Sequence, residues 1–461
     1  MIHGLGFLGL SASLVLPWAL TGLVGGERIT QSVFKDARQS STVQEIPLPK
    51  RKLISAIPTA TTYYVSGNGN DKNSGLSTSS AFRTIQRAAD LTNPGDTVLI
   101  MNGVYTNAPG AGTVVNIKRP GNSTAWITYK AYPGHFPKIQ HNTWHGIAFS
   151  NGASYIQVQG LEVVGNNANI TLAYALSQKT NGSNPLTNGS CISIGGSNAY
   201  VHHIRILNNK VHGCGGGGIG GAQADYVTID NNIVFDNAWY SVYGCSGIGF
   251  LSSWNSDNNR GYKMFITNNK VYRNRMYIPW IAVGKITDGN GIIIDSSKKG
   301  PNGAYQGRTL IANNISYWNG GSGIHAHDSE HVDIVNNTVY GNGQTPELKK
   351  GQLYAGYSSD VKIFNNIIYA YSGQNANSNT KNVNVTYDYN LYPKGAVIAA
   401  MGPHDIIGDP LFVNTSIPDF RIKPGSPAIN SGYYWKDLKT DYLGKTRPAG
   451  GRYDIGAYEY Q

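Results

Sequence analysis

The chain has 461 residues, a length that suits two or three ordinary domains or one elongated repeat protein. Its 57 glycines, 30 tyrosines and low share of charged residues, 14%, are typical of a turn-rich β protein and exclude a helical bundle, which needs more Leu, Ala, Glu and Lys. A net charge of +11 favours an anionic partner, but no Lys/Arg run or basic helix stands out, which argues against nucleic acid.

The N-terminus carries a stretch with the features of a targeting signal. Residues 5–24 are almost continuously apolar, and small residues follow where a signal peptide would be cleaved. We therefore predict a signal peptide over 1–26, a secreted protein, and no stable membrane association after cleavage. Because only His3 precedes the apolar stretch, a retained cell-surface anchor is the alternative. Residues 27–60 lack periodicity and are predicted to be a linker or pro-segment.

Regular structure is expected to begin shortly after residue 60. Residues 80–92 place Phe82, Ile85, Ala88 and Ala89 at helical spacing, which predicts a short amphipathic helix. A strand over 95–105 follows. A short helix of this kind commonly covers the open end of a β solenoid, where backbone groups would otherwise be unpaired.

The middle of the chain repeats a short alternating strand that ends in Asn-Asn. The shortest spacing between these pairs is 23 residues, which suits one coil of a β-helix, and the longer spacings indicate inserted loops. Asn at the same turn of each coil forms a hydrogen-bonded ladder and tolerates the left-handed conformation. We therefore assign these residues a structural role. The pairs begin at 208, 231, 268, 313, 336 and 365.

A second repeated phrase predicts which side chains face outward. If Ile219, Ile248, Ile292 and Ile324 point into the core, the residues one and three places later point out. These outward positions are Gly220 and Ala222, Gly249 and Leu251, Ile293 and Asp295, and His325 and His327. Since neighbouring parallel strands lie about 4.8 Å apart, Asp295 and His327 should stand one above the other on an exposed face.

Long loops gather around the same strand. Segments 252–262 and 297–308 follow it, and 274–288 precedes it. Long loops on one face of a solenoid build a groove, in which exposed aromatic rings can stack on sugars. The aromatic candidates are Trp254, Tyr277, Trp280 and Tyr305.

Three cysteines, Cys191, Cys214 and Cys245, allow at most one disulfide. They are too few for a disulfide framework. The preferred interpretation is that they are small buried side chains.

Residues 63–75 and 81–105 resemble the N-terminal cap and first coil of right-handed parallel β-helix proteins of the pectate-lyase-like superfamily, and 409–460 resembles their C-terminal coil and closing segment. The resemblance spans about 61–461. It implies an all-β, single-stranded right-handed parallel β-helix over 61–408, a closing segment over 409–461, a short N-terminal capping helix and long loops on one face.

By layout, the resemblance is to the family-nine pectate lyases, which use calcium held by aspartates and a lysine base. Asp288 falls near the family's first aspartate motif, and Asp295 stands about where the lysine would be. The coil expected to supply further aspartates reads Gly-Ser-Gly-Ile-His over 321–325. Calcium is therefore a candidate cofactor, with Asp288, Asp295 and Asp328 as candidate ligands.

Residues 323–341 also resemble the Asp-Pro-His-Asp segment of mannuronan C-5 epimerases and related alginate lyases. His327 and Asp328 match its His-Asp, whereas His325 replaces its leading Asp. Epimerases and lyases both abstract the C-5 proton of a uronate.

These features favour a lyase that cleaves an acidic polysaccharide by β-elimination, acting as a monomer. His327 is the candidate base, with Asp295 orienting it. The catalytic set also includes Lys298, Asp288 and Asp328. Lys285, Lys299 and His325, with the four loop aromatics, form the candidate substrate-binding set.

Four alternatives remain open. A glycoside hydrolase would use a carboxyl pair from Asp288, Asp295 and Asp328, and an epimerase would share the proton abstraction. A metal site of His325, His327 and Asp328 is a further alternative. The last is a non-catalytic glycan-binding surface protein.

Overall fold

The computed structural model describes residues 59–196 and 199–461. The predicted signal peptide and most of the predicted linker lie outside the described residues. Within the described part, no helix is long and apolar enough to cross a membrane.

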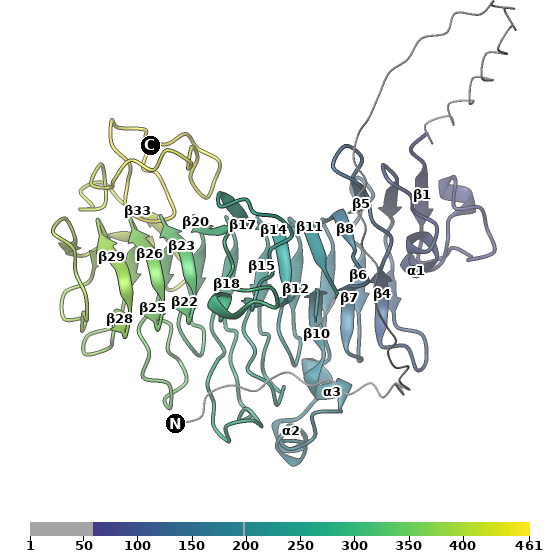
Figure 1. Ribbon diagram of the computed structural model, residues 1–461, viewed down its shortest axis with the longest axis horizontal. Helices are drawn as coiled ribbons and strands as arrows, with labels where there is room; N and C mark the ends of the chain where they lie inside the picture. Colours follow the sequence, from purple (N-terminus) through teal and green to yellow (C-terminus); the bar gives the residue numbers. More distant parts are fainter. Residues whose placement is uncertain (1–58, 197–198) are drawn as a thin grey trace, which may run out of the picture. The chain divides into compact units, whose positions relative to one another are not determined.

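The described chain winds through three long parallel sheets, here named A, B and C, and each coil visits A, then B, then C (Figure 1). Ile and Val side chains from all three sheets fill the space between them. This arrangement confirms the predicted single-stranded parallel β-helix.

Sheet A contains β1 (Thr62–Val65), β2 (Thr97–Ile100), β5 (Ile127–Ala131), β8 (Ser154–Gln159), β11 (Val201–Leu207), β14 (Ala224–Asp230), β17 (Tyr262–Thr267), β20 (Arg308–Ala312), β23 (Glu330–Val335), β26 (Ser359–Phe364) and β29 (Val383–Asp388). Sheet B contains β3 (Val104–Thr106), β6 (Lys138–Gln140), β9 (Glu162–Val164), β12 (Lys210–His212), β15 (Ile233–Phe235), β18 (Lys270–Tyr272), β21 (Ile315–Tyr317), β24 (Thr338–Tyr340), β27 (Ile367–Tyr369), β30 (Leu391–Tyr392) and β31 (Ile406–Ile407). Sheet C contains β4 (Thr113–Ile117), β7 (His145–Phe149), β10 (Ser190–Ile194), β13 (Ile219–Ala222), β16 (Ile248–Leu251), β19 (Ile292–Asp295), β22 (Ile324–His327), β25 (Leu353–Gly356) and β28 (Asn377–Thr380).

The predicted capping helix is present but short. It is α1 (Ile85–Ala89), which contacts β1, β2 and β4 at the first coils. It begins at Ile85 because the Thr84 side chain caps it by accepting a hydrogen bond from the Arg87 N–H. Phe82 lies outside the helix and pairs with Val65, and the predicted strand 95–105 divides into β2 and β3.

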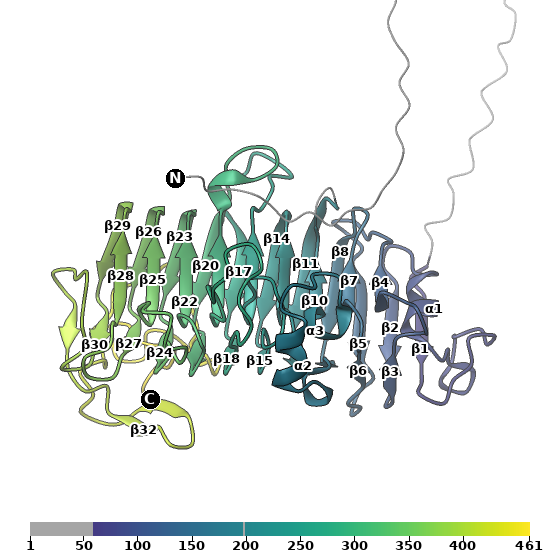
Figure 2. The same ribbon diagram turned by 90° about the horizontal axis from the view of Figure 1, so that it is seen from below.

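The remaining helices are short and lie in connections between strands. These helices are η1 (Thr78–Ser80), η2 (Asn167–Asn169), α2 (Leu172–Ser177), α3 (Pro185–Asn188) and η3 (Ser297–Lys299). Figure 2 places α2 and α3 beside the sheet C strands β7 and β10.

The Asn pairs form the predicted ladder at the turn from sheet A to sheet B. The first Asn of each pair has φ between 54° and 57°, in the left-handed region. The second accepts a hydrogen bond from the backbone N–H of its counterpart one coil earlier, as Asn269 Oδ1 does from Asn232 at 2.9 Å. A second ladder, which the sequence analysis did not predict, runs through the turn from sheet B to sheet C. Its members are Asn237, Asn274, Asn319 and Asn342, and it ends at Gln352.

Cys191 and Cys214 form a disulfide with a Cα–Cα distance of 5.7 Å, whereas Cys245 is free. The interpretation of all three as unlinked buried side chains is therefore wrong. The two cysteines belong to adjacent coils, and stacking of the coils brings their Cα atoms within the range that a disulfide spans.

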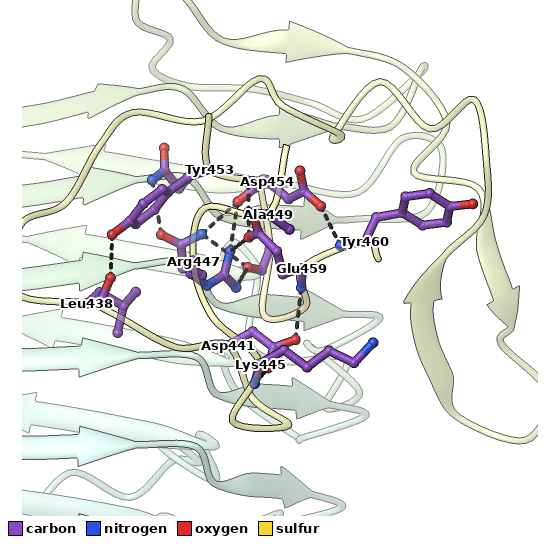
Figure 3. Close-up of polar contacts among 12 residues, drawn as sticks. Leu438, Asp441, Lys445, Arg447, Ala449, Tyr453, Asp454, Glu459 and Tyr460 are labelled. Atoms are coloured by element: carbon purple, nitrogen blue, oxygen red, sulfur yellow. Dashed lines mark hydrogen bonds and ion pairs between the residues drawn. The ribbon is translucent and has the colours of Figure 1, made fainter. Parts of the chain in front are cut away.

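After β31 the chain turns back along the outside of the helix. It forms the antiparallel pair β32 (Phe412–Asn414) and β33 (Asp419–Ile422) and packs against the turns that carry the Asn pairs (Figure 1). A buried ion pair holds this segment together, because Arg447 Nη1 lies 2.7 Å from Glu459 Oε2 (Figure 3).

Candidate functional site

The outward positions of sheet C carry the candidate site. In the pairing of β19 with β22, Asp295 is in register with His327, and Ile293 with His325. Ile292 and Ile324 point into the core and are 0% exposed. The prediction that Asp295 and His327 are neighbours on adjacent coils is therefore confirmed.

The site is less exposed than the sequence suggested. Asp295 and His327 are half-buried, and only 2% of His325 is accessible. The ring of Tyr354 covers His325 edge-on at a centroid distance of 4.3 Å, and Tyr357 lies 5.5 Å from His327. Asp295 and His327, predicted to stand on an exposed face, are therefore partly covered, and His325 is almost completely covered.

The two imidazoles have little hydrogen bonding within the protein. Neither ring nitrogen of His325 has a hydrogen-bond partner, nor does Nδ1 of His327, although these atoms are buried. Burial lowers the pKa of His325 well below its usual value, and the nearby Lys350 and His327 lower it further. His325 is therefore a neutral imidazole at ordinary pH.

Asp295 is a carboxyl group whose ionisation is disfavoured. Burial raises its pKa, and His327 and a hydrogen bond from Ser296 Oγ to Oδ1, 2.8 Å long, oppose that shift. Asp288 and Asp328 raise the pKa of Asp295 further. Asp295 thus holds a proton more readily than an exposed aspartate would.

The site contains a lysine that the sequence analysis missed. Lys350 is half-buried, and its Nζ donates a hydrogen bond to the Thr287 carbonyl, two coils away, at 2.7 Å. Burial lowers the pKa of Lys350, while Asp288 and Asp295 oppose the shift. One signal could have found it. Lys350 stands three residues before Leu353, at the position that Gly289 and Gly321 hold in the two preceding coils.

The predicted lysines have different partners. Lys298 Nζ donates to the Tyr357 carbonyl at 2.7 Å, beside His327. Lys299 forms an ion pair with Asp328. Lys285 is exposed on a turn that begins at Trp280. Lys298 therefore lies at the site, whereas the charge of Lys299 is already neutralised by Asp328.

The loop aromatics are mostly packed. Tyr305 is 1% exposed and donates a hydrogen bond to Asp225 at 2.6 Å, so its prediction as a sugar-stacking residue is wrong. Tyr305 is buried because its loop folds inward over a buried carboxylate. Trp254 is half-buried and its indole N–H donates to the Val201 carbonyl at 3.2 Å. Tyr277 packs edge-on against Trp239. The groove expected between these loops stays a prediction.

The three candidate calcium ligands do not converge. Thr287 and Asn290 donate hydrogen bonds to Asp288, Ser296 to Asp295, and Asp328 pairs with Lys299. Across residues 59–196 and 199–461, the one group of three His, Cys or acidic side chains whose ligand atoms lie within 4.8 Å of one another is His141, Cys191 and Cys214. Calcium needs six to eight converging oxygens, so this arrangement of residues does not fit it. The metal site of His325, His327 and Asp328 does not form either.

Comparison with known proteins gives one family. A family model described as "Pel9A-like, right handed beta helix region" matches residues 63–354. Among curated protein sequences, none matches the chain significantly.

Several solved structures are similar to this chain. The pectate lyase Pel9A is 19% identical and has a TM-score of 0.53, over 88% of this chain and 98% of its own. The GH136 lacto-N-biosidase from Eubacterium ramulus is 15% identical with a TM-score of 0.45, over 76% and 67%. The A-module of the Azotobacter vinelandii mannuronan C-5 epimerase AlgE4 is 15% identical with a TM-score of 0.32, over 70% and 90%. Of these three structures, only Pel9A has a TM-score above 0.5, and at 19% identity its similarity establishes the fold alone.

Proposed function

The chain belongs to the Pel9A-like right-handed β-helix family, and on that premise we propose that it abstracts the C-5 proton of a uronate in an acidic polysaccharide. The expected outcome is β-elimination. The observation that carries the proposal is the register pair of Asp295 and His327 on the outward face of sheet C, where Nδ1 of His327 has no hydrogen-bond partner in the protein and Lys350 interacts electrostatically with Asp295.

In the proposed reaction, each side chain has one role. His327, the more accessible of the two imidazoles, removes the C-5 proton. Lys350 and Lys298 bind the substrate carboxylate and stabilise the negative charge that develops on it. As the C4–O4 bond breaks and the C4–C5 double bond forms, Asp295 returns a proton to the leaving oxygen, a role that its raised pKa supports.

The rival functions have weaker support. A glycoside hydrolase needs two carboxyl groups that face one bond, and the three aspartates here have separate partners. Epimerisation shares the proton abstraction and differs only in the fate of the intermediate. We also propose that the protein is secreted, which the Cys191–Cys214 disulfide supports, since disulfides persist in oxidising compartments.

The test is to incubate the purified protein with polygalacturonate, polymannuronate, polyguluronate and a neutral glucan, with and without a calcium chelator. We expect ultraviolet absorbance from the C4–C5 double bond with one of the uronans, insensitive to chelator. Lys350→Met should lower the rate about 100-fold or more, whereas Lys349→Met, an exposed neighbour, should leave it unchanged.

Three other outcomes would each contradict part of the proposal. New reducing ends without absorbance would mean hydrolysis. Exchange of the C-5 proton with deuterated solvent, without chain cleavage, would mean epimerisation. Neither reaction with any uronan, with the fold intact by circular dichroism, would remove the enzymatic proposal and leave glycan binding.

A further inference from the structure

A second cluster of reactive side chains lies several coils away from the candidate site. His141 follows β6, Cys191 lies in β10 and Cys214 follows β12, so three successive coils contribute one residue each. Their side-chain ligand atoms all lie within 4.8 Å of one another. His141 is 3% exposed and both cysteines are 0% exposed. The proposed reaction uses none of them.

The backbone leaves room for this cluster. Gly165 belongs to the middle coil, and a Cβ at that position would lie 2.6 Å from Cys214 Sγ. The absence of a side chain there lets His141 reach Cys214, two coils away, with Nε2 at 3.2 Å from Sγ. Cys214 also ends the second Asn ladder, because its backbone N–H donates to Asn237 Oδ1 at 3.1 Å.

The imidazole of His141 is arranged as a ligand. Its Nδ1 lies 3.0 Å from the Thr143 carbonyl, which can only accept, so Nδ1 carries the proton. Nε2 is then the nitrogen with the free lone pair, and it faces the sulfur. A hydrogen bond from the other ring nitrogen to a carbonyl is the usual way in which a metal-binding histidine is oriented.

We propose that His141, Cys191 and Cys214 form a site for a thiophilic divalent cation, Zn²⁺ by preference, when the disulfide is reduced. A dithiol or phosphine reductant supplies two electrons, and the two sulfurs take up two protons. The cation then displaces both thiol protons. Zn²⁺ with two thiolates and one neutral imidazole carries no net charge, which lowers the cost of burying the ion, and a water molecule would complete the tetrahedral coordination. Calcium and magnesium, which need oxygen ligands, are excluded by the donor set.

The two states of the cluster are mutually exclusive. The disulfide contains no thiolate and therefore does not bind the cation. In the reduced protein, the cation links coils through His141 and both sulfurs. The same three residues thus tie neighbouring coils together in either redox state.

Binding can be measured with Co²⁺, whose thiolate complexes have characteristic visible and near-ultraviolet absorption. The full protein is reduced with a phosphine, freed of reductant without oxygen, and titrated with Co²⁺ and then Zn²⁺. We expect about one Co²⁺ per chain, displaced by Zn²⁺, and no uptake by the oxidised protein. Cys191→Ser should abolish the thiolate band, and His141→Ala should weaken binding at least about tenfold.

Cys245→Ser is the matched control, because it removes a thiol outside the cluster and should bind Co²⁺ like the parent protein. If Cys191→Ser does not fold, His141→Ala alone decides the matter. The proposal is overturned if the reduced, folded protein takes up no Co²⁺ or if the oxidised protein takes up as much. Loss of binding in Cys245→Ser, or full binding in His141→Ala, would overturn it equally.

Discussion

Two buried polar regions of this β-helix differ in whether opposite charges lie beside their groups. In the first, here named the anchor cluster, Lys263 is fully buried and lies 2.8 Å from Asp225 and 2.9 Å from Asp257. Tyr305 donates a further hydrogen bond to Asp225. In the second, the candidate site, His325 has no hydrogen-bond partner and Lys350 donates to a backbone carbonyl.

On this difference we assign the anchor cluster a structural role, whereas the catalytic role of the candidate site is our proposal. Asp257 and Tyr305 come from the two loops after β16 and β19, so the anchor cluster fastens both loops to sheet A. Each of its charges faces an opposite charge. The candidate site instead contains buried imidazole nitrogens without a hydrogen-bond partner or an opposite charge that pairs with them, an arrangement that costs stability.

The largest effect on folding is expected from the anchor cluster. Lys263→Met should lower the free energy of unfolding by about 3–5 kcal/mol, because it leaves the Asp225 carboxylate buried without its cation. Denaturant unfolding followed by circular dichroism measures the change. Lys362→Met, an exposed lysine on β26, should change it by less than about 0.5 kcal/mol. Equal stability of the Lys263 variant and the parent protein would contradict the assignment.

A substitution in the candidate site should instead lower activity and leave the stability of the protein unchanged. Asp295→Asn should lower turnover about 100-fold, since an amide cannot return a proton to the leaving oxygen. Its stability should not fall, because the substitution removes a carboxyl whose ionisation burial already disfavours. Turnover and denaturant unfolding are measured on the same preparation. A variant that loses stability but keeps its activity would place Asp295 with the structural residues.

The Asn ladder offers an uncharged counterpart to the anchor cluster. Asn269→Ala should cost about 2 kcal/mol of unfolding free energy, because the buried Asn232 N–H and the Ile229 carbonyl both lose their partner. Activity should not change, and chemical denaturation together with the uronan assay checks both statements. An unchanged free energy of unfolding would mean that the backbone alone stabilises the turn.

Acid should destabilise the protein through its buried imidazoles. Burial lowers the pKa of His145 to about 4 from a usual value of about 6.5, so the unfolded chain binds this proton first. Stability is then complete above about pH 6.5 and falls as the pH drops towards 4, by up to about 1.4 kcal/mol per pH unit for each such imidazole. His145→Gln should flatten this dependence in unfolding measured across that range. An unchanged slope would show that other groups dominate.

Several features followed from the sequence because they depend on short-range rules. The alternation of a strand and the repeated phrase around Ile292 and Ile324 placed Asp295 beside His327, and the Asn pairs indicated the ladder. These are relations between residues at matching positions of consecutive coils. A repeat therefore determines them without knowledge of the loops.

Other features depended on the packing of long side chains and loops, which no repeat specifies. Lys350 reaches Thr287 across two coils, Tyr354 covers His325, and Tyr305 turns inward to Asp225. The disulfide between Cys191 and Cys214 likewise depended on which turns stack. The sequence by itself determined the coil, its register and the outward column of Asp295 and His327. Only the tertiary structure decided which polar groups are paired and which have no hydrogen-bond partner in the described protein, because that depends on contacts between residues far apart in the chain.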